Sequence, residues 1–247
     1  MWTLENLLII AATFLFAGFV KGMIGLGLPT VSLAILAATL GLKEAMVLML
    51  LPSFLTNVWQ GISGPAFTRI IRRLWSLLLA GFAGTWLAVG VLARADTVLL
   101  TGLLGIMLCV YAGVSLATLQ IPPPARREGW LSPVIGGVTG VLTGLVGTFI
   151  VPAVPYFQAL GWPRNVLVQA MGIWFTVATL SLAVGLGSHR LLPAELGGLS
   201  AVALVPAFAG MWLGQKVRGR MSEGRFRQVL LISLFILGVY IAGRSFL

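Results

Sequence analysis

A lone lysine and a cluster of glycines interrupt the first long apolar run of this 247-residue chain. Residues 18–29 read GFVKGMIGLGLP and include Lys21, Gly22, Gly25 and Gly27. In hydrocarbon, broken backbone and a charged side chain persist only where they face protein or a watery cavity. Free backbone N–H groups, helix N-termini and an ammonium group together favour an anion. We expect Lys21 to face a central cavity and attract an anion; a lysine extended to the membrane surface is the alternative.

A second glycine-rich stretch lies in the C-terminal half of the chain. Residues 136–147 read GGVTGVLTGLVG, with Thr139 and Gly140 where the first stretch has its lysine. A charged side chain in contact with a bound anion is therefore expected from the first stretch alone. The glycines expected to mark backbone breaks are Gly25, Gly27 and Gly147. The glycines for which close helix packing is the other role are Gly18, Gly22, Gly140 and Gly144.

Polar side chains occupy roughly matching places in the helices that follow each glycine stretch. Asn57 and Gln60 follow the first stretch, and Gln169 and Thr176 follow the second. Hydrogen bonding to a ligand is one role for these side chains, and hydrogen bonding between helices is the other. The complete set of candidate substrate-binding residues is Lys21, Gly22, Gly25, Gly27, Asn57, Gln60, Thr143, Gly144, Gly147, Thr148, Gln169 and Thr176.

The composition places these residues in a membrane protein. Hydrophobic residues make up 59% of the chain and charged residues 9%, with a mean hydropathy of +1.04, too little polar surface for a soluble domain. Most uncharged runs reach the roughly 20 residues that cross a bilayer as a helix. The net charge of +10 lies in loops between these runs, which indicates membrane orientation rather than nucleic-acid binding. We predict an all-α polytopic membrane protein.

An internal repeat is the main organisational feature. Residues 82–87 (FAGTWL) match residues 208–213 (FAGMWL) at five of six positions, in the same order relative to the glycine stretches. We predict one transmembrane domain made of repeat one (1–119), a proline-rich linker (120–131) and repeat two (132–247). Chance similarity between apolar segments is the alternative.

The charge distribution predicts that the repeats are inverted. Basic residues precede the FAG segment in repeat one, whereas they follow it in repeat two. If basic loops are cytoplasmic, corresponding loops lie on opposite sides of the membrane. Each inverted-topology helical repeat then opens with a Gly-broken helical hairpin, either two crossings or a re-entrant loop. Hairpins from opposite faces would bring the glycine breaks together near the midplane; eight full spans are the alternative.

The residues that most catalytic sites need are missing. His189 is the only histidine and Cys109 the only cysteine, so we predict no metal site, no cofactor and no enzymatic activity. All six acidic residues lie at predicted span ends or in loops. This placement argues against a cation carrier and against a membrane-embedded proton relay.

The two glycine stretches and the segments after them resemble the TauE/SafE sulfite exporter family. The resemblance rests on GFVKGMIGLGLPTVSLAIL and GGVTGVLTGLVGTFIVPAVPYFQALGW and covers nearly the whole chain. It implies a multi-pass protein of the bacterial inner membrane that transports small sulfur-containing anions such as sulfite, sulfoacetate or other organosulfonates. We expect a secondary transporter, with export the favoured direction, that works by alternating access at a midplane site. Its partners would be the anion and the lipid bilayer, without nucleic acid.

Two other functions stay open at this point. One is a channel-like facilitator of other small organic anions, and the other is a non-transporting accessory membrane subunit. The oligomeric state is also open, with a homodimer as one option.

Overall fold

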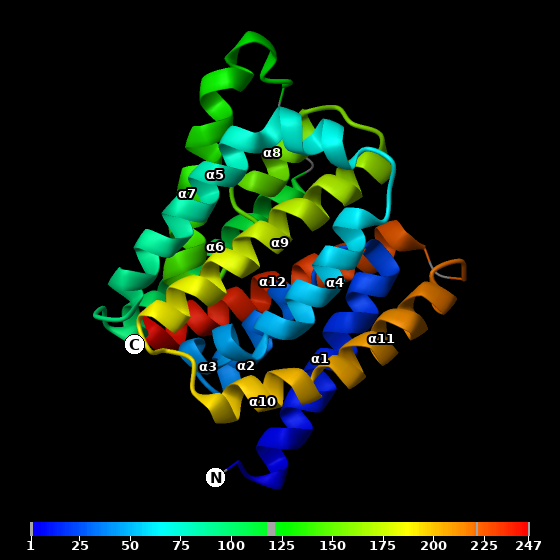
Figure 1. Cartoon of the computed structure of the whole chain (residues 1–247). Helices are drawn as coiled ribbons and strands as arrows, with labels where there is room; N and C mark the ends of the chain where they lie inside the picture. Colours follow the sequence, from blue (N-terminus) through cyan, green and yellow to red (C-terminus); the bar gives the residue numbers. More distant parts are fainter. Residues whose placement is uncertain (1, 118–121, 221, 247) are drawn as a thin grey trace. The chain divides into compact units, whose positions relative to one another are not determined.

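The computed structural model describes residues 2–117, 122–220 and 222–246, and within these ranges every regular element is helical (Figure 1). The helices are α1 (Leu4–Ile24), α2 (Leu28–Thr39), α3 (Leu42–Leu48), α4 (Leu50–Ile62), α5 (Phe67–Leu92), α6 (Thr97–Leu116), η1 (Ala125–Arg127), α7 (Glu128–Val146), α8 (Ala153–Ala159), α9 (Arg164–Ser188), α10 (Ala194–Val202), α11 (Leu204–Val217) and α12 (Glu223–Phe246). In the described part, seven spans are long and apolar enough to cross a membrane, or up to eight if α3 and α4 form one. The predicted all-α polytopic class is confirmed.

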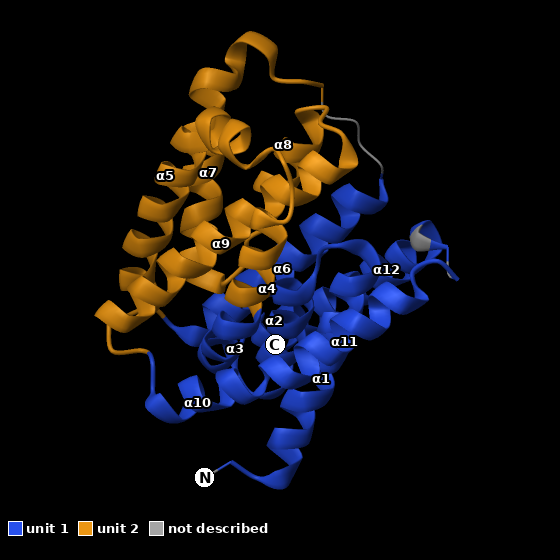
Figure 2. Ribbon diagram, turned by 45° about the vertical axis from the view of Figure 1, so that its right-hand side comes forward, with its two compact units in different colours: residues 1–52, 96–118, 192–247 blue, residues 53–95, 119–191 orange. Residues whose placement is uncertain are grey.

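The described helices form two compact units, coloured separately in Figure 2. Unit 1 comprises residues 1–52, 96–118 and 192–247, and unit 2 comprises residues 53–95 and 119–191. Each unit therefore contains helices from both predicted repeats. Sequence order alone does not decide which helices share a core.

Unit 1 is built on two long helix pairs. Helix α1 packs along α11, and α6 packs along α12, while α2 contacts α1 and α3. The fully buried side chains of this unit include Phe14, Met23 and Leu33. Because these side chains are apolar and enclosed, they supply the packing that holds unit 1 together.

Unit 2 has a corresponding long pair, in which α5 packs along α7. Helix α9 covers this pair, and the short α8 contacts both α7 and α9. Trp174 of α9 is completely buried, and its ring meets Phe157 of α8 edge-on, with ring centroids 6.5 Å apart. Aromatic packing therefore fixes α8 against α9.

Glycines allow the long helices of each pair to touch backbone to backbone. In unit 1, a side chain on Gly18 or Gly22 of α1 would collide with the carbonyl oxygens of Ala207 or Met211 of α11. In unit 2, a side chain on Gly140 or Gly144 of α7 would collide with the carbonyl oxygens of Gly81 or Thr85 of α5. Small residues at this spacing are typical of close helix packing in membranes. Each helix that carries an FAG segment thus packs on the glycine-rich helix of the other predicted repeat.

The helix around Pro52 is bent by 44° between α3 and α4. Pro52 has no N–H, so it cannot donate the helical hydrogen bond to the carbonyl of Leu48. The hydroxyl of Ser200 in α10 donates to that carbonyl at 2.8 Å, and the Leu51 N–H donates to the same hydroxyl at 3.2 Å. A side chain of α10 therefore supplies the hydrogen bonds that the bend removes.

Helix α7 begins at Glu128, inside the stretch predicted as a linker. The last residue of repeat one at 119 and the first two linker residues at 120 and 121 lie outside the described residues. Arg73 of α5 donates from Nε and Nη2 to the two carboxylate oxygens of Glu128, at 2.6 and 2.7 Å. The Arg73 guanidinium also lies 5.0 Å from the centre of the Trp162 ring. A bidentate ion pair therefore holds the start of α7 against α5.

Candidate functional site

The first candidate element is the helix break after α1, in unit 1. Gly25 ends α1 in the left-handed conformation, with φ of 82°, and its N–H donates to the carbonyl of Lys21 at 2.8 Å. Gly27, with φ of 105°, begins α2, which carries Pro29 in its first turn. Residues that carry a side chain rarely adopt these backbone φ values, so both positions call for glycine. Three residues, from Gly25 to Gly27, separate the C-terminal end of α1 from the N-terminal end of α2.

Lys21 lies in the last turn of α1, directly before this break. Its side chain is only 4% exposed. Such burial disfavours the alternative of a lysine extended to the membrane surface. A cation in the last turn also interacts favourably with the negative end of the helix dipole, which is a structural role that requires no ligand. The candidate residues of unit 1 are thus gathered in one turn and one break: Lys21, Gly22, Gly25 and Gly27.

The second candidate element is the helix break after α7, in unit 2. Gly147 ends α7 with φ of 75°, and its N–H donates to the carbonyl of Thr143 at 2.8 Å. The Thr143 hydroxyl lies within hydrogen-bond distance of the carbonyls of Thr139, at 2.7 Å, and Thr148, at 2.8 Å. The indole N–H of Trp174 donates to the carbonyl of Phe149 at 2.8 Å. Side-chain hydrogen bonds therefore hold the non-helical backbone after Gly147.

The two breaks share one backbone pattern, and this corrects an expectation from the sequence. Lys21 and Thr143 each accept the N–H of the left-handed glycine that ends the helix. The position equivalent to Lys21 is therefore Thr143, and not Thr139 or Gly140 as expected. The difference arises because the helix ends, rather than the first glycines of each stretch, define the equivalent positions.

The side chain of Gln169 in α9 bonds to backbone groups at the end of α4 and in the turn after it. Its side-chain amide nitrogen donates to the carbonyls of Gly61, at 3.0 Å, and Gly64, at 2.8 Å. Its side-chain oxygen accepts the N–H of Ala66 at 3.1 Å. These bonds hold the turn after α4 against α9. The sequence left open whether Gln169 bonds a ligand or a neighbouring helix, and these partners belong to the second role.

Three further polar candidates, Asn57, Gln60 and Thr176, lie in the same two helices, α4 and α9. The Gln60 amide donates across to the carbonyl of Val168 at 2.7 Å, and the Thr176 hydroxyl donates to Gly172 of its own helix at 2.7 Å. Asn57 is fully buried in α4. Gln60 therefore links α4 to α9, as Gln169 does.

Trp174 lies beside the second helix break but was not among the candidate residues chosen from the sequence. Trp59, Trp86 and Trp212 are 63%, 45% and 59% exposed, as residues facing lipid would be, whereas Trp174 is buried. Its position near the middle of a long apolar run could have indicated a buried role, because tryptophans of the membrane interface lie near the ends of spans.

Carboxylates do not contribute to either break in the described part of the chain. The five acidic residues whose side chains are described lie at the surface or are partly exposed: Glu5, Glu44, Asp96, Glu128 and Glu195. Among the described residues, no cluster of His, Cys, Asp or Glu side chains is able to hold a metal ion. Lys21 is thus the charged candidate at the two breaks.

A comparison with protein families supplies a match for almost the entire sequence. The family model described as "Sulfite exporter TauE/SafE" matches residues 10–241, a range that includes both helix breaks. Comparisons with curated proteins and with solved structures find no match.

Proposed function

Because the chain belongs to the TauE/SafE sulfite exporter family, we propose that it is a secondary transporter of sulfite, sulfoacetate or another organosulfonate, with export the favoured direction. The observation that carries this proposal is the family match over residues 10–241. The family implies a membrane transporter of sulfur-containing anions, and the seven candidate spans of the described chain agree with a multi-pass membrane protein. The bacterial inner membrane is the location we propose.

The anion, on this proposal, binds at the break between α1 and α2. A sulfite or sulfonate group presents several oxygens and a negative charge, which a compact ammonium such as that of Lys21 attracts. Gly25 and Gly27 carry no side chain, so an anion can approach the backbone closely there. In unit 2, Thr143, Gly144, Gly147 and Thr148 form the uncharged counterpart of this element.

We further propose alternating access at a midplane site by inverted repeats, each opening with a Gly-broken hairpin. The repeated glycine contacts in the two units support this proposal, as does the reversed order of basic loops. The surface positions of the described carboxylates support a mechanism without a proton relay through a buried acid.

The test is transport by the purified chain in liposomes. Sulfite, sulfoacetate, sulfate and acetate are loaded inside in turn, and efflux is followed with an anion-specific assay. We expect sulfite or sulfoacetate to leave faster than sulfate and acetate, and an external anion of the same kind to accelerate efflux. Acceleration identifies a carrier, whereas unsaturable efflux without acceleration would support a channel-like facilitator. An inserted protein that moves none of these anions would support an accessory subunit.

A further inference from the structure

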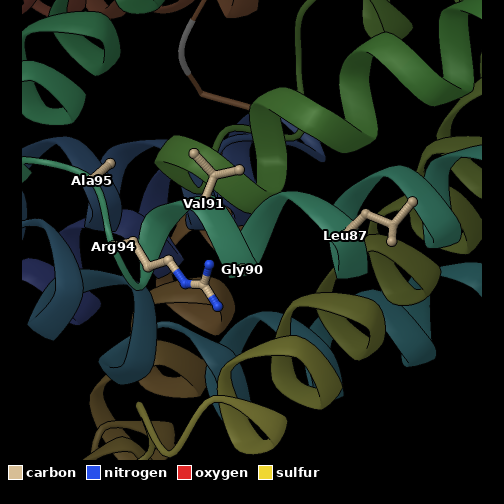
Figure 3. Close-up of a pocket in the computed structure, with 5 residues that line it drawn as sticks. All are labelled: Leu87, Gly90, Val91, Arg94 and Ala95. Carbon is tan, nitrogen blue, oxygen red and sulfur yellow. The ribbon is translucent and has the colours of Figure 1, made fainter.

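A groove on unit 2 lies along the last turns of α5, away from both helix breaks. It has a volume of about 460 Å³ and is lined by Leu87, Gly90, Val91, Arg94 and Ala95 (Figure 3). Leu87, Gly90 and Val91 recur at intervals of three and four in the last turns of α5, and Arg94 and Ala95 follow in the turn after the helix. Leu87 and Arg94 lie toward the two ends of the groove, with Gly90 and Val91 between them (Figure 3).

The apolar end of the groove is open. Leu87 and Val91 are 65% and 55% exposed, and α5 is one of the candidate membrane spans. Apolar side chains exposed on a membrane helix contact lipid chains. This end of the groove is therefore suited to a hydrocarbon chain and unsuited to a small hydrated anion.

The other end of the groove is cationic. Arg94 follows the C-terminal cap of α5 at Ala93, and its side chain is exposed. His189, the C-terminal cap of α9, lies beside Gly90, because a Cβ on Gly90 would be 3.3 Å from the His189 Nε2. Neither Arg94 nor His189 makes an ion pair with another side chain in the described part of the chain. Arg94 thus borders one end of the groove, and the His189 ring lies beside the groove at Gly90.

Gly90 keeps the groove open between these groups. It has no side chain, and the nearest atoms to a Cβ placed there belong to the His189 ring. A larger residue at position 90 would occupy the groove, and the exposed His189 side chain could move aside. The apolar face, the gap and the cationic end occur in the order in which a phospholipid presents its chain, its glycerol and its phosphate.

We propose that this groove binds an anionic phospholipid, with its phosphate at Arg94 and His189 and an acyl chain along Leu87 and Val91. Positive residues at the end of a span attract anionic headgroups, at about fivefold in affinity for each arginine near the surface. The proposal goes beyond the transport function and does not depend on it. The alternative role of Arg94 is to offset the negative C-terminal end of α5 without a ligand.

The test uses the full-length protein in detergent, titrated with phosphatidylglycerol and, separately, with phosphatidylcholine. Bound lipid is counted by native mass spectrometry, and the unfolding temperature is measured at each lipid concentration. We expect phosphatidylglycerol to bind more tightly than phosphatidylcholine, and Arg94→Gln to weaken phosphatidylglycerol about fivefold. Arg94→Lys, which keeps the positive charge at the same place, is the matched control and should bind phosphatidylglycerol as the unaltered protein does.

Gly90→Leu tests the same groove without removing a charge. We expect it to displace phosphatidylglycerol while leaving the unfolding temperature of the lipid-free protein unchanged, and this readout remains if Arg94→Gln does not fold. Equal binding of phosphatidylglycerol to the unaltered, Arg94→Gln and Gly90→Leu proteins would overturn the proposal. Equal affinity for phosphatidylcholine, or displacement of the lipid by inorganic phosphate or sulfite at equal concentration, would also overturn it.

Discussion

The hydroxyl of Ser200 donates to the carbonyl of Leu48 at 2.8 Å, and both residues are buried in unit 1. This carbonyl is the one that Pro52, lacking an N–H, leaves without its helical donor. In hydrocarbon, an unsatisfied carbonyl costs several kcal/mol, so a bend of this kind requires a donor from elsewhere. The bend between α3 and α4 is thus stabilised by a residue that lies far away in the sequence.

Replacing Ser200 with alanine should therefore destabilise the protein. We expect Ser200→Ala to lower the free energy of unfolding by about 1–3 kcal/mol, the usual cost of leaving a buried polar group without its partner. Ser233→Ala is the control, since the exposed Ser233 hydroxyl bonds only to Val229 of its own helix. Reversible unfolding in mixed detergent measures both. A cost for Ser200→Ala no larger than that for Ser233→Ala would contradict this role.

Lys21 is expected to govern transport rather than folding. Lys21→Met should reduce sulfite or sulfonate flux in liposomes by about tenfold or more, because it removes a charge-assisted interaction. Lys43→Met changes a partly exposed lysine of the same unit and should leave flux unchanged. Both variants should elute as the unaltered protein does on size exclusion. Normal flux through inserted Lys21→Met would refute the anion role.

Close packing of α7 on α5 makes Gly144 intolerant of a side chain. A Cβ there would collide with the carbonyl oxygen of Thr85. Gly144→Ala should lower the free energy of unfolding by about 1–3 kcal/mol, as overpacking does. In the helical control Gly198→Ala, the Cβ meets open space, and the change should be neutral or stabilising by up to about 1 kcal/mol. Equal effects of the two changes would show that backbone contact does not limit position 144.

Inverted repeats predict opposite sidedness for the loops before the two FAG segments. Single cysteines are introduced as Ser63→Cys and Leu192→Cys in a Cys109→Ala background, and both sites are exposed. A membrane-impermeant maleimide added outside intact cells should label one site and not the other, because corresponding loops of inverted repeats face opposite sides. Labelling of both sites from the same side would exclude the inverted arrangement.

The class of the protein and the two glycine breaks were accessible from the sequence. Apolar runs of about 20 residues require helices in a bilayer, since only internal hydrogen bonds are available there. Gly25, Gly27 and Gly147 were expected to mark backbone breaks, and all three have the positive φ that glycine permits at little cost. The family resemblance also rested on these stretches, and the family match confirms it.

Only the tertiary structure decided which groups meet. Hydropathy and glycine spacing are properties of one segment, whereas the carbonyl that faces Gly144, or the hydroxyl that reaches Leu48, belongs to a distant segment. For the same reason the sequence left open whether Gln169 binds a ligand or neighbouring backbone, and the structure supplies its backbone partners. Lys21 and the glycines around it could be found from residue type because a charge and a broken backbone are costly in hydrocarbon. Thr143 takes the place of Lys21 relative to the helix-ending glycine, but only the folded backbone showed that its hydroxyl reaches the carbonyls of Thr139 and Thr148.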